Sequence, residues 1–308
     1  MAHQQNPNPS PLVAWKNGHW LPLDQAGPSL ADTGWVQGVT VVDVLRTVQG
    51  EPFLLDRHLD RFFRDCKSLA IETRWNRETM AEVVHQLLVK NKVGPNPHRA
   101  WSIILLATPG TLPHYASREP SGATQIVHGF PLPTARYSSW FSEGARLVAS
   151  PVLASIPGPI DPRIKHRSRL HWWMAQQMAS RENPGALPVL LTSNGEVTET
   201  ALAHLAWVTQ RSGRDLLVIP PEELVLDGIS LNLALELAKK IGLPIERAPF
   251  GWKDLQGAKE AFITGSGFGL CGVSRVGHTS LPFPGPYTQQ LQQAWSTFAG
   301  EPIDASFT

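Results

Sequence analysis

The order of apolar segments along the chain most strongly constrains its fold. Continuous apolar runs typical of buried strands, such as residues 101–108, alternate with segments whose apolar residues recur every three or four positions. Helices of this second kind are predicted from Asp56 and over residues 229–242. The two kinds of segment occur in both halves without a strict strand–helix–strand order, which predicts an α+β or α/β protein rather than a doubly wound parallel sheet. The length of 308 residues favours two domains.

Turn residues suggest where these segments begin and end. Asn17-Gly18 is the pair best suited to a tight hairpin turn. The run PLPTARYSSW breaks the apolar pattern and is the expected linker. We therefore expect a disordered tail over residues 1–11, a smaller α/β domain over 12–130, an interdomain linker over 131–140 and a larger α/β domain over 141–308.

The balance of charges removes the main reason to expect a nucleic-acid partner. Lys and Arg total 27 and Asp and Glu total 26, so the formal net charge is +1, and only the run Lys165–Arg169 is locally basic. Two cysteines without a Cys/His cluster predict neither a disulfide framework nor a metal site. The first residues do not resemble a signal peptide, and no apolar run reaches the roughly 18 residues that cross a bilayer. We expect a cytoplasmic protein without a membrane partner.

Lys165 is the first candidate for chemistry. It lies in the segment IKHRSRL, ahead of a predicted helix rich in Trp and Met. Apolar walls and cationic neighbours both lower the pKa of an amine, which makes it a nucleophile for a carbonyl group. Ile164, Leu170, Trp172 and Trp173 are the expected walls. The alternative is a solvated basic face in which the lysine has no special role.

Glu199 is the second candidate. The segment EVTETALAHLAWV, residues 196–208, predicts one strand in which Val197, Glu199, Ala201 and Ala203 share a face. A carboxylate among small residues leaves room for a flat molecule to lie over the sheet and meet it. The alternative is a glutamate on an edge strand that points into water.

Two further segments have the properties of anion sites. Gly228, Ile229 and Ser230 stand at the start of a predicted helix, where unpaired amides and the positive end of the helix dipole favour an anion. The glycine-rich loop Thr264–Gly269 follows a predicted strand, and its amides and the Ser266 hydroxyl suit a phosphate. Most helix starts bind only a capping side chain, so neither segment is specific alone.

Arg61 is a further candidate for phosphate binding. It lies about one turn into the helix predicted from Asp56. A planar guanidinium suits a phosphate group because it offers two parallel donors. The ordinary alternative is a surface ion pair with Asp60 or Asp65.

Taken in order, these segments resemble the class IV aminotransferases. This family of pyridoxal-phosphate enzymes of fold type IV includes branched-chain and D-amino-acid aminotransferases and 4-amino-4-deoxychorismate lyase. The resemblance runs from about Asp32 to the closing segment PGPYTQQL, and it rests on the order and approximate spacing of the motifs rather than on any one of them. The matching stretches are DTGWVQGVTVVDVLRT, LLDRHLDRF, IKHRSRL, NGEVTET, LDGIS and AFITGSG.

The resemblance implies a role for each candidate residue. Lys165 would bind pyridoxal 5′-phosphate as a Schiff base and shuttle the α-proton of the substrate, and Glu199 would keep the pyridine nitrogen protonated. It also implies two domains with the cofactor in the cleft between them, a homodimer, and small-molecule amino-acid and keto-acid substrates. The remaining candidates for cofactor binding, mainly through the phosphate, are Arg61, Ile229, Ser230, Gly265 and Ser266.

Several residues depart from the family pattern. Leu170 stands where branched-chain enzymes usually have tyrosine, and the KHxxRL arrangement of residues 165–170 looks more like the lyase. His204, Leu231 and Gly272 replace a frequent asparagine, arginine and proline. We expect an aminotransferase that passes the amino group to a keto acid. The alternatives are a 4-amino-4-deoxychorismate lyase, which releases pyruvate and 4-aminobenzoate, and a non-catalytic relative that acts as a binding module.

Overall fold

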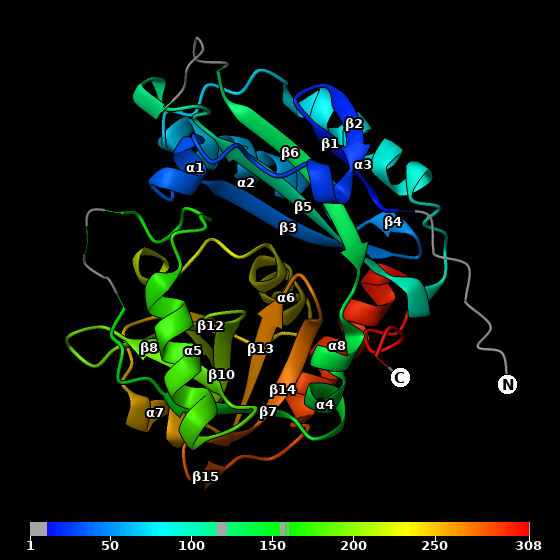
Figure 1. Ribbon diagram of the computed structural model, residues 1–308. Helices are drawn as coiled ribbons and strands as arrows, with labels where there is room; N and C mark the ends of the chain where they lie inside the picture. Colours follow the sequence, from blue (N-terminus) through cyan, green and yellow to red (C-terminus); the bar gives the residue numbers. More distant parts are fainter. Residues whose placement is uncertain (1–10, 116–121, 155–157, 159, 308) are drawn as a thin grey trace, which may run out of the picture. The chain divides into compact units, whose positions relative to one another are not determined.

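The chain folds into two compact units (Figure 1). The computed structural model describes residues 11–115, 122–154, 158 and 160–307, so nearly all of the tail expected over residues 1–11 lies outside the described residues. The N-terminal unit comprises Met1–Pro95 and Trp101–Pro131, and the C-terminal unit comprises Asn96–Ala100 and Leu132–Thr308. Each unit has its own sheet and its own apolar core.

A six-stranded antiparallel sheet forms the centre of the N-terminal unit, in the order β2-β1-β6-β5-β3-β4. The hairpin predicted at Asn17-Gly18 joins β1 to β2. Both turn residues have the positive φ angles that a type I′ turn requires, 49° and 90°. The strands are β1 (Val13–Lys16), β2 (His19–Pro22), β3 (Val41–Val48), β4 (Glu51–Pro52), β5 (Trp101–Thr108) and β6 (Thr124–Pro131).

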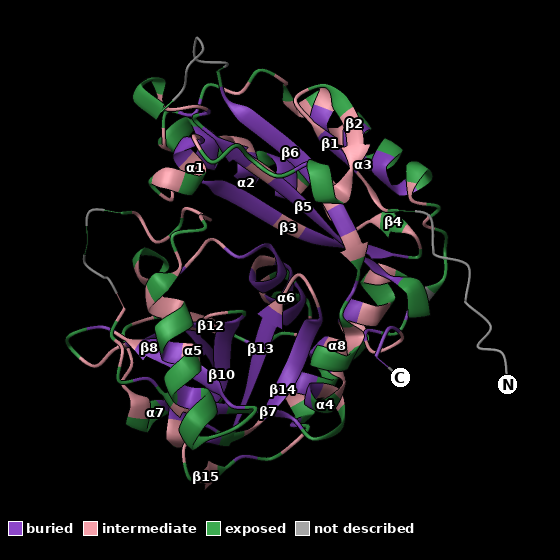
Figure 2. Ribbon diagram, viewed as in Figure 1, coloured by how far each residue is buried: buried purple, intermediate pink, exposed green. Residues whose placement is uncertain are grey.

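Two helices pack against this sheet. α2 (Leu55–Ser68) contacts β3, and α3 (Arg77–Lys90) contacts β1 and β6. The inner side of α2 carries Leu59, Phe62 and Cys66, all buried, as the predicted spacing requires. Figure 2 shows the strands β3, β5 and β6 as largely buried. The unit also contains α1 (Thr33–Val36) and 3₁₀ turns at Leu23–Gln25 and Pro113–Tyr115.

The C-terminal unit is built on a mixed sheet in the order β12-β11-β10-β13-β14-β7-β8-β9, with β15 paired to β14. Parallel and antiparallel pairs both occur, so the sheet is not doubly wound, as predicted. The central strands β10, β13 and β14 are buried over most of their length (Figure 2). The strands are β7 (Ala145–Ala149), β8 (Leu187–Leu191), β9 (Val197–Thr200), β10 (His204–Arg211), β11 (Arg214–Ile219), β12 (Ile245–Arg247), β13 (Glu260–Gly265), β14 (Gly269–Val276) and β15 (Thr279–Ser280).

Helices bury the central strands of this sheet because each presents an apolar side to it. α6 packs against β13, α8 against β13 and β14, and α5 against β8. None of the helices in the described ranges combines the length and the hydropathy needed to cross a membrane. The helices are α4 (Ser138–Ser142), α5 (Leu170–Glu182), α6 (Ile229–Lys240), α7 (Trp252–Gln256) and α8 (Pro286–Ala299), with 3₁₀ turns at Pro97–Arg99, Thr134–Arg136 and Glu222–Leu224.

The segment predicted as a linker, residues 131–140, is folded. The helix α4 begins within it, at Ser138. Trp140 is buried and lies against Tyr137 and Phe268 in the core of the C-terminal unit. The prolines at the start of this segment suggested irregular chain, whereas the aromatic residues at its end join a core. The domain limits drawn from the sequence stay a prediction.

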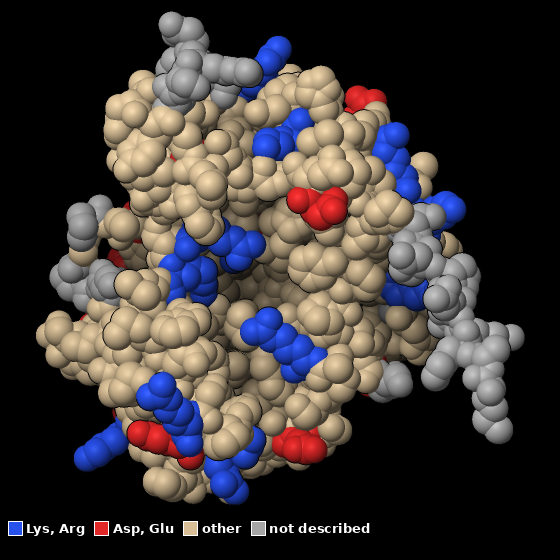
Figure 3. All heavy atoms as spheres, in the orientation of Figure 1, with Lys and Arg blue, Asp and Glu red and all other residues tan. Residues whose placement is uncertain are grey.

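Charges are distributed over the surface without one continuous basic region on the face that Figure 3 shows. Lys and Arg side chains there are separated by uncharged residues and by Asp and Glu. This distribution agrees with the formal net charge of +1. A small net charge gives little long-range attraction for a polyanion.

Phe62 tests the core of the N-terminal unit. Its side chain is fully buried in that core, so Phe62→Ala leaves a cavity. We expect the free energy of unfolding to fall by about 3–5 kcal/mol. Urea denaturation measures it, and Phe298→Ala on α8, where the side chain is 44% exposed, is the control. Equal losses in the two variants would contradict the assignment of Phe62 to the core.

Candidate active site

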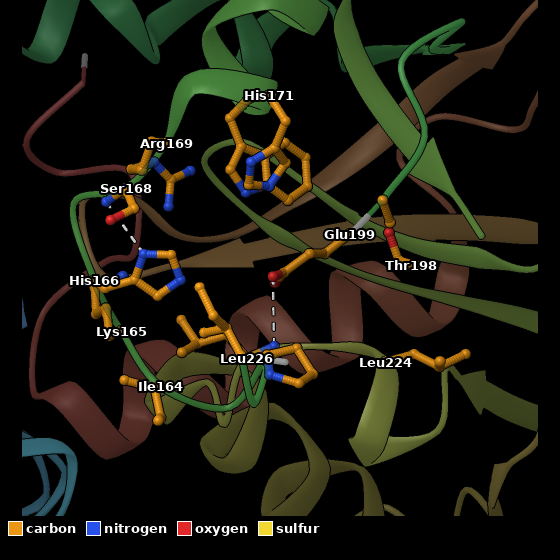
Figure 4. Close-up of a pocket in the computed structure, with 14 residues that line it drawn as sticks. Ile164, Lys165, His166, Ser168, Arg169, His171, Thr198, Glu199, Leu224 and Leu226 are labelled. Carbon is orange, nitrogen blue, oxygen red and sulfur yellow. Dashed lines mark hydrogen bonds between the residues drawn. The ribbon is translucent and has the colours of Figure 1, made fainter. Parts of the chain in front are cut away.

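A pocket in the C-terminal unit contains both Lys165 and Glu199 in its wall (Figure 4). Lys165 comes from the loop ahead of α5, and Glu199 comes from β9. Every described residue that lines the pocket belongs to this unit. The pocket is partly open to solvent. An amine and a carboxylate that are distant in the sequence therefore face one cavity.

The loop that carries Lys165 supplies only part of the apolar wall that the sequence predicts. Ile164 and Trp172 line the pocket. Leu170 and Trp173 do not, because they are 70% and 62% exposed. These two residues stand three positions apart on α5, so they share a helix face, and that face is the solvent-exposed one.

Basic side chains make up most of the polar lining. Besides the lysine they are His166, Arg169 and His171. Burial lowers the pKa of both histidines below the ordinary value, and the charge of Arg169 lowers it further, so neutral imidazole rings are favoured at neutral pH. Nδ1 of His166 accepts a hydrogen bond from the Ser168 N–H at 3.1 Å, as an unprotonated nitrogen does (Figure 4). The lining favours an anionic ligand.

Arg169 is a site residue that the sequence analysis did not select. Its guanidinium donates a hydrogen bond to the carbonyl oxygen of Ala201 and lies 5.6 Å from the centre of the Trp172 ring. Burial lowers the pKa of this guanidinium, and the carboxylate of Glu199 opposes that shift. One feature of the sequence could have identified it: Arg169 belongs to the same motif as Lys165. In the structure it occupies the N-cap position of α5.

Glu199 is held at the pocket by two neighbours. Its Oε1 atom accepts a hydrogen bond of 3.4 Å from the backbone N–H of Leu226, drawn as a dashed line in Figure 4. Its Oε2 atom lies 2.8 Å from Nδ1 of His204, and the Glu199 side chain is only 16% exposed. The alternative of a glutamate pointing into water is therefore wrong, although β9 does form an edge of the sheet.

The single strand predicted over residues 196–208 is interrupted. β9 ends at Thr200, and β10 begins at His204. The hydroxyl of Thr200 accepts hydrogen bonds from the backbone N–H groups of Leu202 and Ala203, at 3.2 and 2.9 Å, and these bonds turn the chain. The prediction that four residues of this segment share one face of a continuous strand is wrong for that reason.

The helix start predicted as an anion site continues directly from the pocket wall. Leu226 lines the pocket, and two residues later Gly228 caps the N-terminus of α6. No side chain caps this helix, and its first two residues, Ile229 and Ser230, are buried. The first amides of a helix have no partner within the helix, so those of α6 are suited to an anion.

The glycine-rich loop packs against the turn that follows Thr200. Gly265 ends β13, and Ser266 lies in the turn to β14. A Cβ atom on Gly265 would lie 3.1 Å from the carbonyl oxygen of Leu202 and 2.7 Å from the Phe268 ring, which leaves no room for a larger residue. The candidate residues of the C-terminal unit are thus on segments that line the pocket, continue from its wall or pack against the bend after Glu199.

Arg61 lies in the N-terminal unit, on α2, and is buried. Its Nε and Nη2 atoms each donate a 2.8 Å hydrogen bond to the carboxylate of Asp43 on β3, and Nδ1 of His58 lies 2.6 Å from the same carboxylate. The ion pair is therefore buried and reaches across to the sheet. The alternative of a pair on the protein surface is wrong.

Asp43 is charged because of these two neighbours. Burial by itself raises the pKa of its carboxyl group, but Arg61 and His58 lower it to well below its ordinary value near 3.8. The folded protein therefore gains stability from this carboxylate above the pKa that it has in the unfolded chain. That contribution is lost as the pH falls through the lower pKa of the folded state.

The residues of the pocket fit the cofactor that the family resemblance implies. A lysine is available for covalent attachment, a carboxylate held at Leu226 is available for the pyridine nitrogen, and an uncapped helix start is available for the phosphate. Thr264 adds a buried hydroxyl without a hydrogen-bond partner among the described residues, on the strand that ends at the glycine-rich loop. These groups are the donor set that pyridoxal phosphate requires.

Comparison with known families shows which family the chain belongs to. A model of the family described as amino-transferase class IV matches residues 40–276, well over half of the chain. The matched span includes the pocket that holds Lys165 and Glu199.

Curated relatives carry several activities. The chain is 27% identical to branched-chain-amino-acid aminotransferase-like protein 1 of Arabidopsis thaliana over 96% of its own length, but it spans only about half of that protein (53%). It is 26% identical to aminodeoxychorismate lyase of Bacillus subtilis, over 82% of this chain and 83% of the lyase. It is 22% identical to D-alanine aminotransferase of Listeria monocytogenes, over 90% of this chain and 92% of that enzyme.

Solved structures confirm the expected fold class. The Escherichia coli branched-chain amino acid aminotransferase superposes with a TM-score of 0.81, at 20% identity over 94% of each chain. The branched-chain aminotransferase of Thermoproteus uzoniensis with norvaline also has a TM-score of 0.81, at 20% identity over 95% of this chain and 96% of its own. A further branched-chain amino acid aminotransferase, with a TM-score of 0.79 and 20% identity, is complexed with N-(5′-phosphopyridoxyl)-L-glutamate. At this identity the likeness is one of fold.

Asp43→Asn tests the buried ion pair. The amide keeps the shape of the side chain but leaves the charge of Arg61 uncompensated, so we expect a loss of about 3–5 kcal/mol in the free energy of unfolding at pH 7. Below the ordinary aspartate pKa near 3.8 the difference between wild type and variant shrinks, because the Asp43 carboxyl group of the unfolded wild-type chain takes up a proton there while the folded protein still holds the charged form. Urea denaturation at several pH values measures both effects.

Asp56→Asn is the matched control for that experiment. Asp56 pairs with Arg77 at the surface, where the aspartate side chain is 83% exposed, and we expect little change in stability. A variant at Asp43 that is as stable as this control at pH 7 would contradict the buried-pair assignment.

Proposed function

This chain belongs to the class IV aminotransferases, and we propose that it removes the α-proton of an amino-acid substrate and transfers the amino group to a keto acid. It is a pyridoxal-phosphate-dependent enzyme, an aminotransferase or a lyase. When bound, the cofactor supplies a conjugated ring that accepts the electrons left behind by the α-proton. The observation that carries the proposal is a pocket whose wall contains both a lysine and a carboxylate.

We assign the covalent and proton-transfer roles to Lys165. Its amine is the group in the pocket able to bond to an aldehyde and, once displaced by the substrate amine, to accept the α-proton at Nζ. Because neutral rings are favoured for His166 and His171, Arg169 is the group beside Lys165 that always carries a positive charge. The cationic lining also attracts the carboxylate of an amino-acid substrate.

We assign the pyridine nitrogen to Glu199. A carboxylate next to that nitrogen favours its protonated form, and a protonated ring accepts electrons more readily. The hydrogen bond from the Leu226 N–H and the contact with His204 fix the carboxylate in place. The phosphate contacts that we propose are the amides of Ile229 and Ser230 and the loop residues Gly265 and Ser266.

The lyase is the second candidate. The KHxxRL arrangement of residues 165–170 supports it, as does the similarity to the Bacillus subtilis lyase, which extends over most of both chains. Release of pyruvate from aminodeoxychorismate without an added amino acceptor would establish the lyase. Amino transfer to 2-oxoglutarate or pyruvate would establish the aminotransferase.

A substrate panel is the most informative experiment. We would follow the absorbance of the bound cofactor with L- and D-amino acids and with aminodeoxychorismate, because each reactive substrate changes the cofactor band. We further propose a cytoplasmic homodimer, which analytical ultracentrifugation and cell fractionation test. A purified protein that stays colourless after addition of pyridoxal phosphate would contradict the proposed function and support a binding module.

Lys165→Ala tests the covalent role. We expect complete loss of turnover and of the borohydride-reducible adduct, because no other group in the pocket replaces the amine. Mass spectrometry after reduction measures the adduct. Thermal unfolding of the apoprotein should be unchanged, since the lysine lies in a loop and contributes no core volume. Lys240→Ala, at the exposed end of α6, is the control, and an adduct that survives in the Lys165 variant would refute the assignment.

Glu199→Gln tests the partner of the pyridine nitrogen. An amide does not favour the protonated ring, so we expect cofactor to remain bound while kcat falls about 100-fold or more. Stopped-flow absorbance measures the α-proton removal step, and a substrate deuterated at the α-carbon shows whether that step limits the rate. A fully active Glu199→Gln enzyme would show that this carboxylate is misassigned.

A further inference from the structure

We propose that His204 is a positioning residue that holds the carboxylate of Glu199 against the start of α6. The inference rests on the proposed function, because it concerns the group that we assign to the pyridine nitrogen. The family resemblance marks His204 only as a replacement for a frequent asparagine. Its surroundings in the fold give it a specific role.

The first observation is the contact with Glu199. Nδ1 of His204 lies 2.8 Å from Oε2, and the two side chains are 7% and 16% exposed. The Nδ1–H direction is not aligned with the carboxylate in this structure, so Nδ1 has no completed hydrogen bond. The distance of 2.8 Å keeps the two groups within interaction range, and a hydrogen bond to a charged carboxylate is among the stronger ones.

The second observation is the contact with Gly228, the residue that caps α6. A Cβ atom on Gly228 would lie 2.0 Å from Nε2 and 2.1 Å from Cδ2 of His204. The φ angle of Gly228 is −85°, which any residue adopts, so its backbone does not require glycine. The position is glycine because the imidazole ring occupies the space of a side chain. The ring therefore lies between Glu199 and the helix start.

The third observation concerns the neighbouring strand. His204 on β10 pairs with Thr264 on β13, so their side chains stand next to each other on one face of the sheet. The Thr264 hydroxyl is buried and has no partner in the described part of the chain. A histidine that only filled a core would be expected among apolar groups, whereas this one has a hydroxyl and a carboxylate beside it.

These contacts give His204 a directional role. A proton on Nδ1 places a donor 2.8 Å from Oε2 while the Leu226 N–H donates to Oε1, so the two carboxylate oxygens have different partners. Because the ring lies between Gly228 and Glu199, it also fixes the position of the carboxylate relative to the start of α6. The other titratable groups that line the pocket or adjoin it are Lys165, His166, Arg169, His171 and Asp227.

Two nearly isosteric variants separate positioning from packing. His204→Asn and His204→Leu both remove the ring from Gly228, but only asparagine keeps a donor at the position of Nδ1. We expect His204→Leu to lower kcat about tenfold, with little change in the KM for substrate, and His204→Asn to stay near wild type. A role in packing alone would give the two variants the same activity.

A second readout does not depend on turnover. The visible band of the bound cofactor changes with pH in the absence of substrate. In His204→Leu we expect the midpoint of this pH-dependent change to move about half to one unit to higher pH. The nitrogen of the cofactor ring would hold its proton less firmly, and a less protonated ring withdraws less electron density from the linkage to Lys165. The midpoint of His204→Asn should match wild type. His278, exposed in the turn between β14 and β15, receives the same two substitutions as a control.

The outcomes are distinguishable. If wild type binds pyridoxal phosphate and His204→Leu has a wild-type kcat and midpoint, the positioning role is overturned while the proposed function stands. If wild type binds no cofactor, the proposed function fails with it. Should His204→Leu not fold, His204→Phe replaces it, because phenylalanine keeps an aromatic ring at this position and has no nitrogen donor.

Discussion

The turn at residues 201–203 is the constraint on which the site depends. In a continuous strand, residues 199 and 204 would point to opposite faces of the sheet, because they are an odd number of positions apart. The Thr200 hydroxyl instead accepts hydrogen bonds from the amides of Leu202 and Ala203, and the chain turns. Glu199 and His204 then approach to 2.8 Å, and the glycine-rich loop finds room beside Leu202. One side-chain hydrogen-bonding pattern thus creates the carboxylate site.

The two units differ in how far their charged side chains compensate one another. In the N-terminal unit the Asp43 carboxylate is buried with Arg61 and His58, so positive and negative groups compensate each other. In the pocket of the C-terminal unit, the basic side chains outnumber the carboxylate of Glu199. An excess of one sign of charge in a partly buried site is costly, which favours an anionic ligand in the pocket rather than a purely structural cluster.

The sequence predicted features that depend on local pattern. The spacing of Leu59 and Phe62 identified α2, and the pair Asn17-Gly18 identified the hairpin, because periodicity and φ preferences belong to short segments. The order of motifs selected Lys165 and Glu199, which share a pocket. Those predictions required no knowledge of how distant segments pack.

The features that the sequence missed depend on side-chain contacts. The turn after Thr200 is invisible to hydropathy, because it comes from the hydrogen bonds of one side chain and the segment from 196 to 208 contains no glycine or proline to mark it. The exposure of Leu170 and Trp173 follows from where α5 begins, which sets the face that each residue occupies. The buried partner of Arg61 lies on another element, so charges close in sequence were the wrong ones to consider.

The departures from the family pattern have physical explanations within this chain. Leu231 is buried in α6, and a Cβ atom on Gly272 would lie 3.0 Å from the Phe283 ring, so both residues serve packing. His204 and Gly228 are complementary, because the imidazole ring occupies the space that a larger residue at 228 would need. His204, Leu231 and Gly272 therefore each have a role in the fold or beside Glu199. They give no reason to favour a non-catalytic module over an enzyme.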